Sequence, residues 1–163
     1  MADRSQVALP SYVHWLRRHV GHQKVILTGA AGLIRDAHGR VLLQKRRGNA
    51  LWGFPGGLQE LGETIAEAAC REVREEVGLQ VEAKRLIGIY TTPALDRQYP
   101  NGDVTQVFIA FFECEVTGGA LELQDEEVLE AGWFDLDNLP QMQPCCALKA
   151  ADAKTFTGEA YFR

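Results

Sequence analysis

Cysteine is scarce in this 163-residue chain, and its placement excludes the common cysteine-based sites. The four cysteines have no CxxC spacing and no neighbouring histidine cluster, so a zinc site is not expected. A chain of this size can form its core without disulfides, and we expect buried, reduced thiols. The adjacent Cys145 and Cys146 leave one weaker alternative, a redox-active pair.

Long apolar runs and an excess of positive charge are also missing. No apolar stretch reaches the roughly 20 residues that a membrane-spanning helix needs, and the first residues lack the apolar region of a signal peptide. The net charge of -5 opposes binding to a nucleic acid polymer, because that affinity depends on Lys and Arg contacts to phosphates. We therefore expect a cytoplasmic protein without membrane or nucleic acid polymer as partner. A small phosphorylated ligand is still compatible, because a metal cation can neutralise its charge.

Strands outnumber helices in the hydrophobic pattern. Periodicity and turn residues predict helices over 10–20, 64–77 and 144–154, and strands over 24–33, 41–43, 81–90, 104–116 and 130–135. The turn signal at 36–39 predicts that the first two strands form a hairpin, and the Gly/Pro-broken segment 51–57 predicts a loop. The pattern favours an α/β fold, an α/β/α sandwich around a mixed β-sheet.

Length and a hydrophobic content of 46% fit one compact domain. We expect a central domain over 23–140, preceded by an N-terminal helical extension over 1–22. Residues 141–163 are expected to form a helix and tail that pack on the same domain. The N-terminal helix is compatible with two arrangements, a homodimer contact or packing against its own sheet.

The segment 64–77 combines strong helix boundaries with an unusual distribution of charge. Thr64, with Glu67 three residues later, predicts a capping box, and Gly78 predicts the C-terminal end of the helix. At about 100° per residue, the small and aliphatic side chains share one face. Three further glutamates cluster at the edge of that face rather than opposite to it: Glu72, Glu75 and Glu76.

Two interpretations of this glutamate cluster are open. Surface glutamates with salt-bridge partners are the commoner case on a charged helix. Here Glu72 and Glu76 repel as like charges four residues apart, and carboxylates turned toward a core are costly without a cation. A divalent cation resolves both difficulties, and oxygen ligands suit Mg²⁺, with Mn²⁺ as a substitute. The preceding loop, Pro55-Gly56-Gly57, can offer a carbonyl to the metal and amides to a phosphate.

Residues 57–79 resemble the Nudix box, Gx₅Ex₇REUxEExGU, in which U is an aliphatic residue. All nine constrained positions are met: Gly57, Glu63, Arg71, Glu72, Val73, Glu75, Glu76, Gly78 and Leu79. The resemblance in organisation extends over about 24–140. It implies a Nudix α/β/α sandwich with a catalytic loop–helix–loop. It also implies attack of water on a phosphorus of a nucleoside diphosphate linked to another group, as in nucleoside triphosphates, nucleotide sugars and dinucleotides.

The resemblance further implies the roles of the site residues. The metal ligands would be the Gly57 carbonyl and the three clustered carboxylates, Glu72, Glu75 and Glu76. Glu63 and Arg71 would form a salt-bridged pair that supports the loop–helix–loop. The base that activates water would be Glu76 or Glu127, the latter in the acidic segment 124–127, for which an exposed acidic turn is an equally good interpretation.

Six residues near the box are candidates for substrate contact: Arg46, Arg47, Trp52, Phe54, Gly56 and Tyr99. Aromatic side chains are more often core residues, and basic strand ends often serve only solubility. The expected partner is a small-molecule nucleotide, whose identity the sequence leaves open. The alternative function is a Nudix-fold module that binds nucleotide without cleaving it. The loss of a box glutamate would favour this alternative, but all the box glutamates are present.

Overall fold

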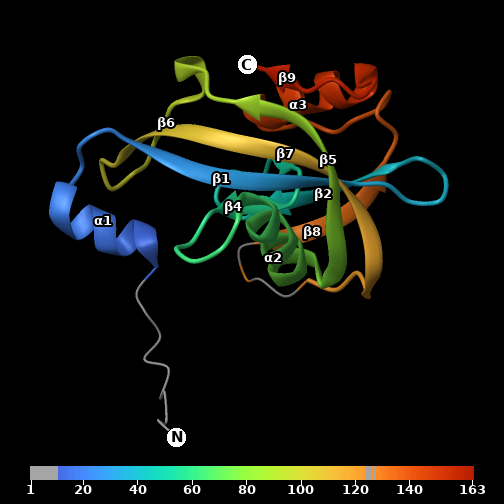
Figure 1. The fold of residues 1–163 in the computed structure, drawn as a ribbon, viewed down its shortest axis with the longest axis horizontal. Helices are drawn as coiled ribbons and strands as arrows, with labels where there is room; N and C mark the ends of the chain where they lie inside the picture. Colours follow the sequence, from blue (N-terminus) through green and yellow to red (C-terminus); the bar gives the residue numbers. More distant parts are fainter. Residues whose placement is uncertain (1–10, 124–125, 127) are drawn as a thin grey trace, which may run out of the picture.

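Two β-sheets form the centre of the structure, a computed structural model that describes residues 11–123, 126 and 128–163 (Figure 1). The larger sheet is mixed, with strand order β4-β1-β7-β5-β9 and β6 paired to β7 beside this path. Its strands are β1 (Val25–Ile34), β4 (Gly56–Leu58), β5 (Leu79–Tyr90), β6 (Arg97–Gln98), β7 (Val104–Gly119) and β9 (Tyr161–Phe162). The smaller sheet is antiparallel and consists of β3 (Trp52–Gly53), β2 (Val41–Arg46) and β8 (Val128–Phe134).

Two helices cover the sheets from different sides (Figure 1). The helix α2 (Ile65–Val77) packs Val73 and Val77 against Ile34 and Leu42. The helix α3 (Pro144–Thr155) belongs to a second apolar cluster with residues of β1, β2, β5 and β7. This arrangement confirms the predicted α/β fold with a mixed sheet. In the described ranges, no helix is both long enough and apolar enough to span a bilayer.

The predicted hairpin over 24–43 is wrong. The turn exists, with Gly39 N–H donating to Asp36 O at 3.0 Å, but β1 and β2 enter different sheets and share only the bridge between Arg35 and Val41. The cause is non-local, because β1 is already flanked by β7 on one side and by β4 on the other. The predicted loop at 51–57 likewise contains β3 and β4, which are short strands held by those same sheets.

Both ends of the described chain are tied to the sheets by polar contacts. The helix α1 (Tyr12–Val20) has no buried residue, and Arg17 Nη2 fixes it by donating to Val104 O at 3.0 Å and to Thr105 Oγ1 at 2.9 Å. At the other end β9 pairs with β5, and Arg163 Nη2 donates to the buried Asp152 Oδ1 at 2.7 Å. A short 3₁₀ helix, η1 (Pro93–Leu95), precedes β6.

The boundaries of α2 follow the sequence prediction. Thr64 Oγ1 accepts from Glu67 N–H at 3.2 Å, and Glu67 Oε2 accepts from Thr64 N–H at 2.7 Å, which completes the capping box. Gly78 ends the helix in the left-handed conformation, with φ of 78°. The capping box therefore fixes where the helix begins, and with it the direction in which the later glutamates point.

Replacing Thr64 by Ala should lower the free energy of unfolding by about 1 kcal/mol, because the Glu67 N–H loses its acceptor, the Thr64 hydroxyl. Urea unfolding measures this change, and Thr64→Ser serves as the control because it keeps the hydroxyl. Equal stability of the two variants would contradict the role given to the cap.

Candidate active site

The loop before α2 runs so close to β1 and α2 that it requires glycine. The pairing of β1 with β4 places Gly56 opposite Ala31 and Gly57 opposite Ala30. A Cβ on Gly57 would lie 2.5 Å from the Glu72 carboxylate. The Glu72 carboxylate therefore lies beside the Gly57 backbone, in the space that a side chain at position 57 would occupy.

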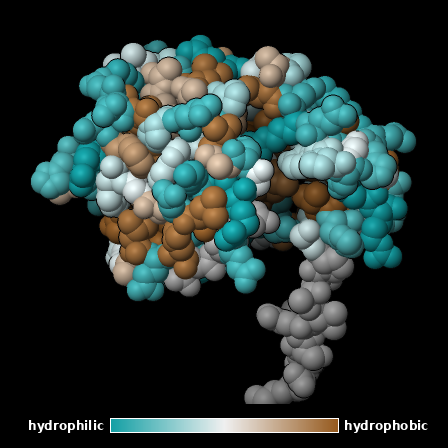
Figure 2. Space-filling model, turned by 180° about the vertical axis from the view of Figure 1, so that it is seen from behind, coloured by the Kyte–Doolittle hydropathy of each residue, from teal (hydrophilic) through white to brown (hydrophobic). Residues whose placement is uncertain are grey.

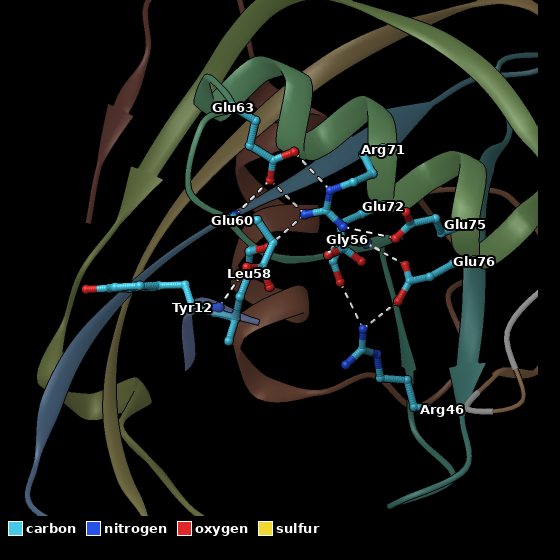
Figure 3. A network of polar contacts seen from close by, with 10 residues as sticks. All are labelled: Tyr12, Arg46, Gly56, Leu58, Glu60, Glu63, Arg71, Glu72, Glu75 and Glu76. Carbon is cyan, nitrogen blue, oxygen red and sulfur yellow. Dashed lines mark hydrogen bonds and ion pairs between the residues drawn. The ribbon is translucent and has the colours of Figure 1, made fainter. Parts of the chain in front are cut away.

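The Glu76 carboxylate is buried behind this loop, with only 3% of the residue exposed. Its Oε2 accepts from Gly56 N–H at 2.7 Å, and its Oε1 accepts from Arg46 Nη2 at 2.6 Å (Figure 3). Burial raises the pKa of Glu76 to about 7, although Arg46, the Gly56 amide and the side chain of Gln44 oppose the rise. The sequence prediction missed Gln44, which is fully buried at the end of an apolar run in β2 and carries no local signal of a site.

Arg71 holds the other carboxylates of the box (Figure 3). Its Nε and Nη2 donate to the two Glu63 oxygens at 2.9 and 2.8 Å, so the predicted supporting pair is formed in bidentate geometry. Its Nη1 donates to Glu72 Oε1 at 2.9 Å and to Glu75 Oε2 at 3.0 Å, and its Nη2 also donates to Leu58 O. The hydrogen bonds from Arg71 lower the pKa of Glu63, whereas burial raises the pKa of Glu72.

The predicted metal ligands are close to one another but are held by arginines. Within the described residues, no three His, Cys, Asp or Glu side chains are gathered as an ion would need. Glu75 is half-exposed, and Glu127, the alternative base, lies outside the described residues. The available donors are carboxylate and carbonyl oxygens, and the missing Cβ of Gly57 leaves room for the Glu72 carboxylate beside its backbone. This donor chemistry fits Mg²⁺.

A cavity of about 400 Å³ opens beside these residues. Of the predicted site residues, its lining includes Arg46, Phe54, Gly56, Gly57, Glu72, Glu76 and Tyr99. Figure 2 shows the molecule from behind, with a hollow on this face in which hydrophobic side chains lie. The cavity thus joins the acidic edge of α2 to apolar walls, a combination typical of a small-molecule site.

Two of the predicted substrate contacts lie elsewhere. Trp52 packs edge-on against Phe134, with ring centres 4.8 Å apart. Arg47 Nε donates to Glu126 O at 2.9 Å, and Arg47 lines a neighbouring cavity of about 800 Å³. The lining residues that were not predicted include Arg97, Gln143 and Lys149, because single polar residues far from the box carry no local signal.

A family model, the NUDIX domain, matches residues 26–153. The chain belongs to the Nudix family. An ADP-ribose pyrophosphatase of Methanocaldococcus jannaschii is 40% identical over 112 residues, which are 67% of this chain and 62% of that relative. The chain therefore matches less than two thirds of the length of this curated relative.

Solved structures show the same Nudix fold. The crystal structure of a MutT Nudix hydrolase from Burkholderia pseudomallei is 26% identical, with a TM-score of 0.63 over 78% of this chain and 98% of that one. An ADP-ribose pyrophosphatase from Streptococcus suis is 24% identical, with a TM-score of 0.65 over 84% of this chain and 97% of that one. The similarity to the Streptococcus suis structure, at 24% identity, shows only that the two chains share a fold.

Proposed function

We propose that this Nudix protein is a Mg²⁺-dependent pyrophosphohydrolase. It cleaves a pyrophosphate bond in a nucleoside diphosphate linked to another group, giving a nucleoside monophosphate and the phosphorylated second group. The observation that carries this proposal is the contact of the Glu72 and Glu76 carboxylates with the Gly56-Gly57 backbone at the wall of one cavity. Oxygen donors of this kind suit a hard cation and the phosphates it carries.

Glu72, Glu75, Glu76 and the Gly57 carbonyl would hold the Mg²⁺. When bound, Mg²⁺ would neutralise phosphate charge and lower the pKa of a bound water. Glu76 must first exchange its bond to Arg46, whose guanidinium can then turn to a phosphate oxygen in the same cavity. Glu63 and Arg71 keep the loop and helix in register and do not touch the reacting atoms.

The proton of the attacking water goes to a carboxylate, for which Glu76 and Glu127 are the two candidates. Glu76 lines the cavity, and burial raises its pKa to about 7, which suits a general base near neutral pH. Glu127 is proposed from its place in the sequence alone.

Incubation with a panel of ADP-ribose, nucleotide sugars, nucleoside triphosphates and dinucleoside polyphosphates tests this function. The name of the archaeal relative supports placing ADP-ribose in the panel. We expect turnover of at least one compound with Mg²⁺, its loss in EDTA and its return when Mg²⁺ is added back, with both products identified by chromatography. Saturable nucleotide binding without turnover of any compound would instead support a non-catalytic Nudix-fold binding module.

A further inference from the structure

Polar side chains of α3 and of the residue before it also line the cavity beside the Nudix glutamates. Lys149 lines this cavity and is only 4% exposed. Within the described residues, its amine contacts the Cys146 thiol at 4.0 Å and lies 5.8 Å from the centre of the Phe111 ring, and it pairs with no carboxylate. A buried amine with such weak partners is costly, unless a ligand supplies the missing acceptor.

Two more polar side chains line the same cavity. Arg97 lines the cavity, and its Nη2 donates to Cys145 Sγ at 3.4 Å. Gln143 is nine-tenths buried and lines the cavity as well, and its side chain makes no capping bond to α3. Lys and Arg only donate hydrogen bonds, whereas the Gln amide can donate or accept.

Part of the cavity wall is apolar. Ala30, Ala31, Phe54 and Val107 line it, and each is at most 4% exposed. Such walls suit a flat aromatic ring better than a second phosphate, which would need polar contacts on all its oxygens. A nucleobase whose phosphates reach the glutamates therefore fits the chemistry along the whole cavity.

We propose that Lys149, with Gln143, makes this cavity selective for nucleobases that carry a keto group at the edge facing α3. The inference rests on the proposed function, because it assigns the base-binding part of that site. Hypoxanthine, guanine, uracil and thymine present a carbonyl oxygen beside a ring N–H, which matches the Lys149 amine and the Gln143 carbonyl. Adenine and cytosine present an amino group instead, a donor that would face the Lys149 donor.

Calorimetric binding of nucleoside monophosphates in Mg²⁺ tests this selectivity without requiring turnover. IMP and AMP differ at the exocyclic group and its neighbouring ring nitrogen, and UMP and CMP form a second matched pair. We expect the keto member of each pair to bind on the order of 10- to 100-fold more tightly, since a mismatched buried donor loses its partner. In Lys149→Met the two members of each pair should bind within about 2-fold, because the remaining Gln143 amide can turn to donate or to accept and so matches either member.

Lys154→Met is the matched control, because Lys154 lies on the same helix but is half-exposed and pairs with Asp137. It should keep the wild-type preference. Lys149→Met should also melt at the same temperature as the wild type or higher, since a buried amine is replaced by an apolar side chain of similar length. That melting curve separates lost selectivity from lost folding.

Three results would overturn the proposal. The first is equal binding, or tighter binding of the amino member, in the wild type. The second is a keto preference that persists in Lys149→Met, which would assign Lys149 to the neighbouring thiols, where it contributes to a lowered pKa of Cys145. The third is no binding of any of the four monophosphates. Failure of the proposed function is a separate result, namely binding without turnover in the substrate panel.

Discussion

Replacing Arg71 by Met should lower the free energy of unfolding by about 1–3 kcal/mol, because it removes the shared partner of a partly buried ion-pair network. Arg71 is bonded to both Glu63 oxygens, to Glu72, to Glu75 and to the Leu58 carbonyl. Its loss leaves the Glu63 carboxylate, which is 16% exposed, without its cation. Urea unfolding of the metal-free protein measures the effect.

Two controls distinguish the effect of losing these ion pairs from the effect of losing one arginine from α2. Arg74→Met removes the same charge from the exposed face of α2 and should change stability by less than about 0.5 kcal/mol. The double variant Glu63→Gln with Arg71→Met should recover part of the loss, because the unpaired carboxylate is gone. Additive effects of the two single changes would contradict a direct pair.

Stability should also decrease when the pH is lowered, and the size of this decrease should depend on Arg71. The hydrogen bonds from Arg71 lower the pKa of Glu63 below its ordinary value of 4.5. The stabilisation is therefore complete above pH 4.5 and is lost as the pH falls through the lowered pKa. The difference in unfolding free energy between wild type and Arg71→Met should shrink when the pH is lowered from about 6 towards 3. A difference that stays constant over this range would contradict the charged pair.

The parts of the site that the sequence predicted are those encoded by neighbouring residues. The capping box and the glycine at the end of α2 depend on short spacings along the chain, whereas the Glu63–Arg71 pair was expected from the resemblance to the Nudix box. Such short-range patterns specify a helix and its faces without knowledge of the rest of the chain. The register of the glutamates along α2 could therefore be predicted before the sheets were known.

The parts that were missed depend on distant residues. The hairpin prediction failed because β1 pairs with β7, about 80 residues further along the chain. The sequence of a single strand does not specify which other strand it pairs with. Lys149 and Arg97 reach the cavity only because α3 packs against β3 and β5 and because β6 pairs with β7. A lone lysine in a helix is usually solvated, and only its burial in the structure reveals that it belongs to the site.

Replacing Glu76 by Gln should reduce Mg²⁺-dependent turnover by about 10²- to 10⁴-fold, the range expected when a general base is lost. The same change should leave the melting temperature in EDTA unchanged or higher, because burial outweighs the contacts from Arg46 and the Gly56 amide and raises the pKa of this carboxyl to about 7, and the Gln oxygen can still accept a hydrogen bond. The stabilisation that Mg²⁺ gives the wild type should decrease in the variant, since a ligand stabilises in proportion to its affinity for the folded state. Turnover and thermal melting, each with and without Mg²⁺, measure these three effects.

A loss of turnover together with an unchanged or higher melting temperature in EDTA distinguishes a functional carboxylate from a structural one. If Glu76 mainly served the fold by anchoring Gly56 and Arg46, its replacement by Gln would lower the melting temperature in EDTA. The exposed Glu82→Gln should alter neither stability nor turnover. If Glu76→Gln binds Mg²⁺ more weakly but recovers wild-type turnover at saturating Mg²⁺, Glu76 is a ligand and not the base. The proton then goes to Glu127, and Glu127→Gln should show the loss of turnover with normal Mg²⁺ stabilisation.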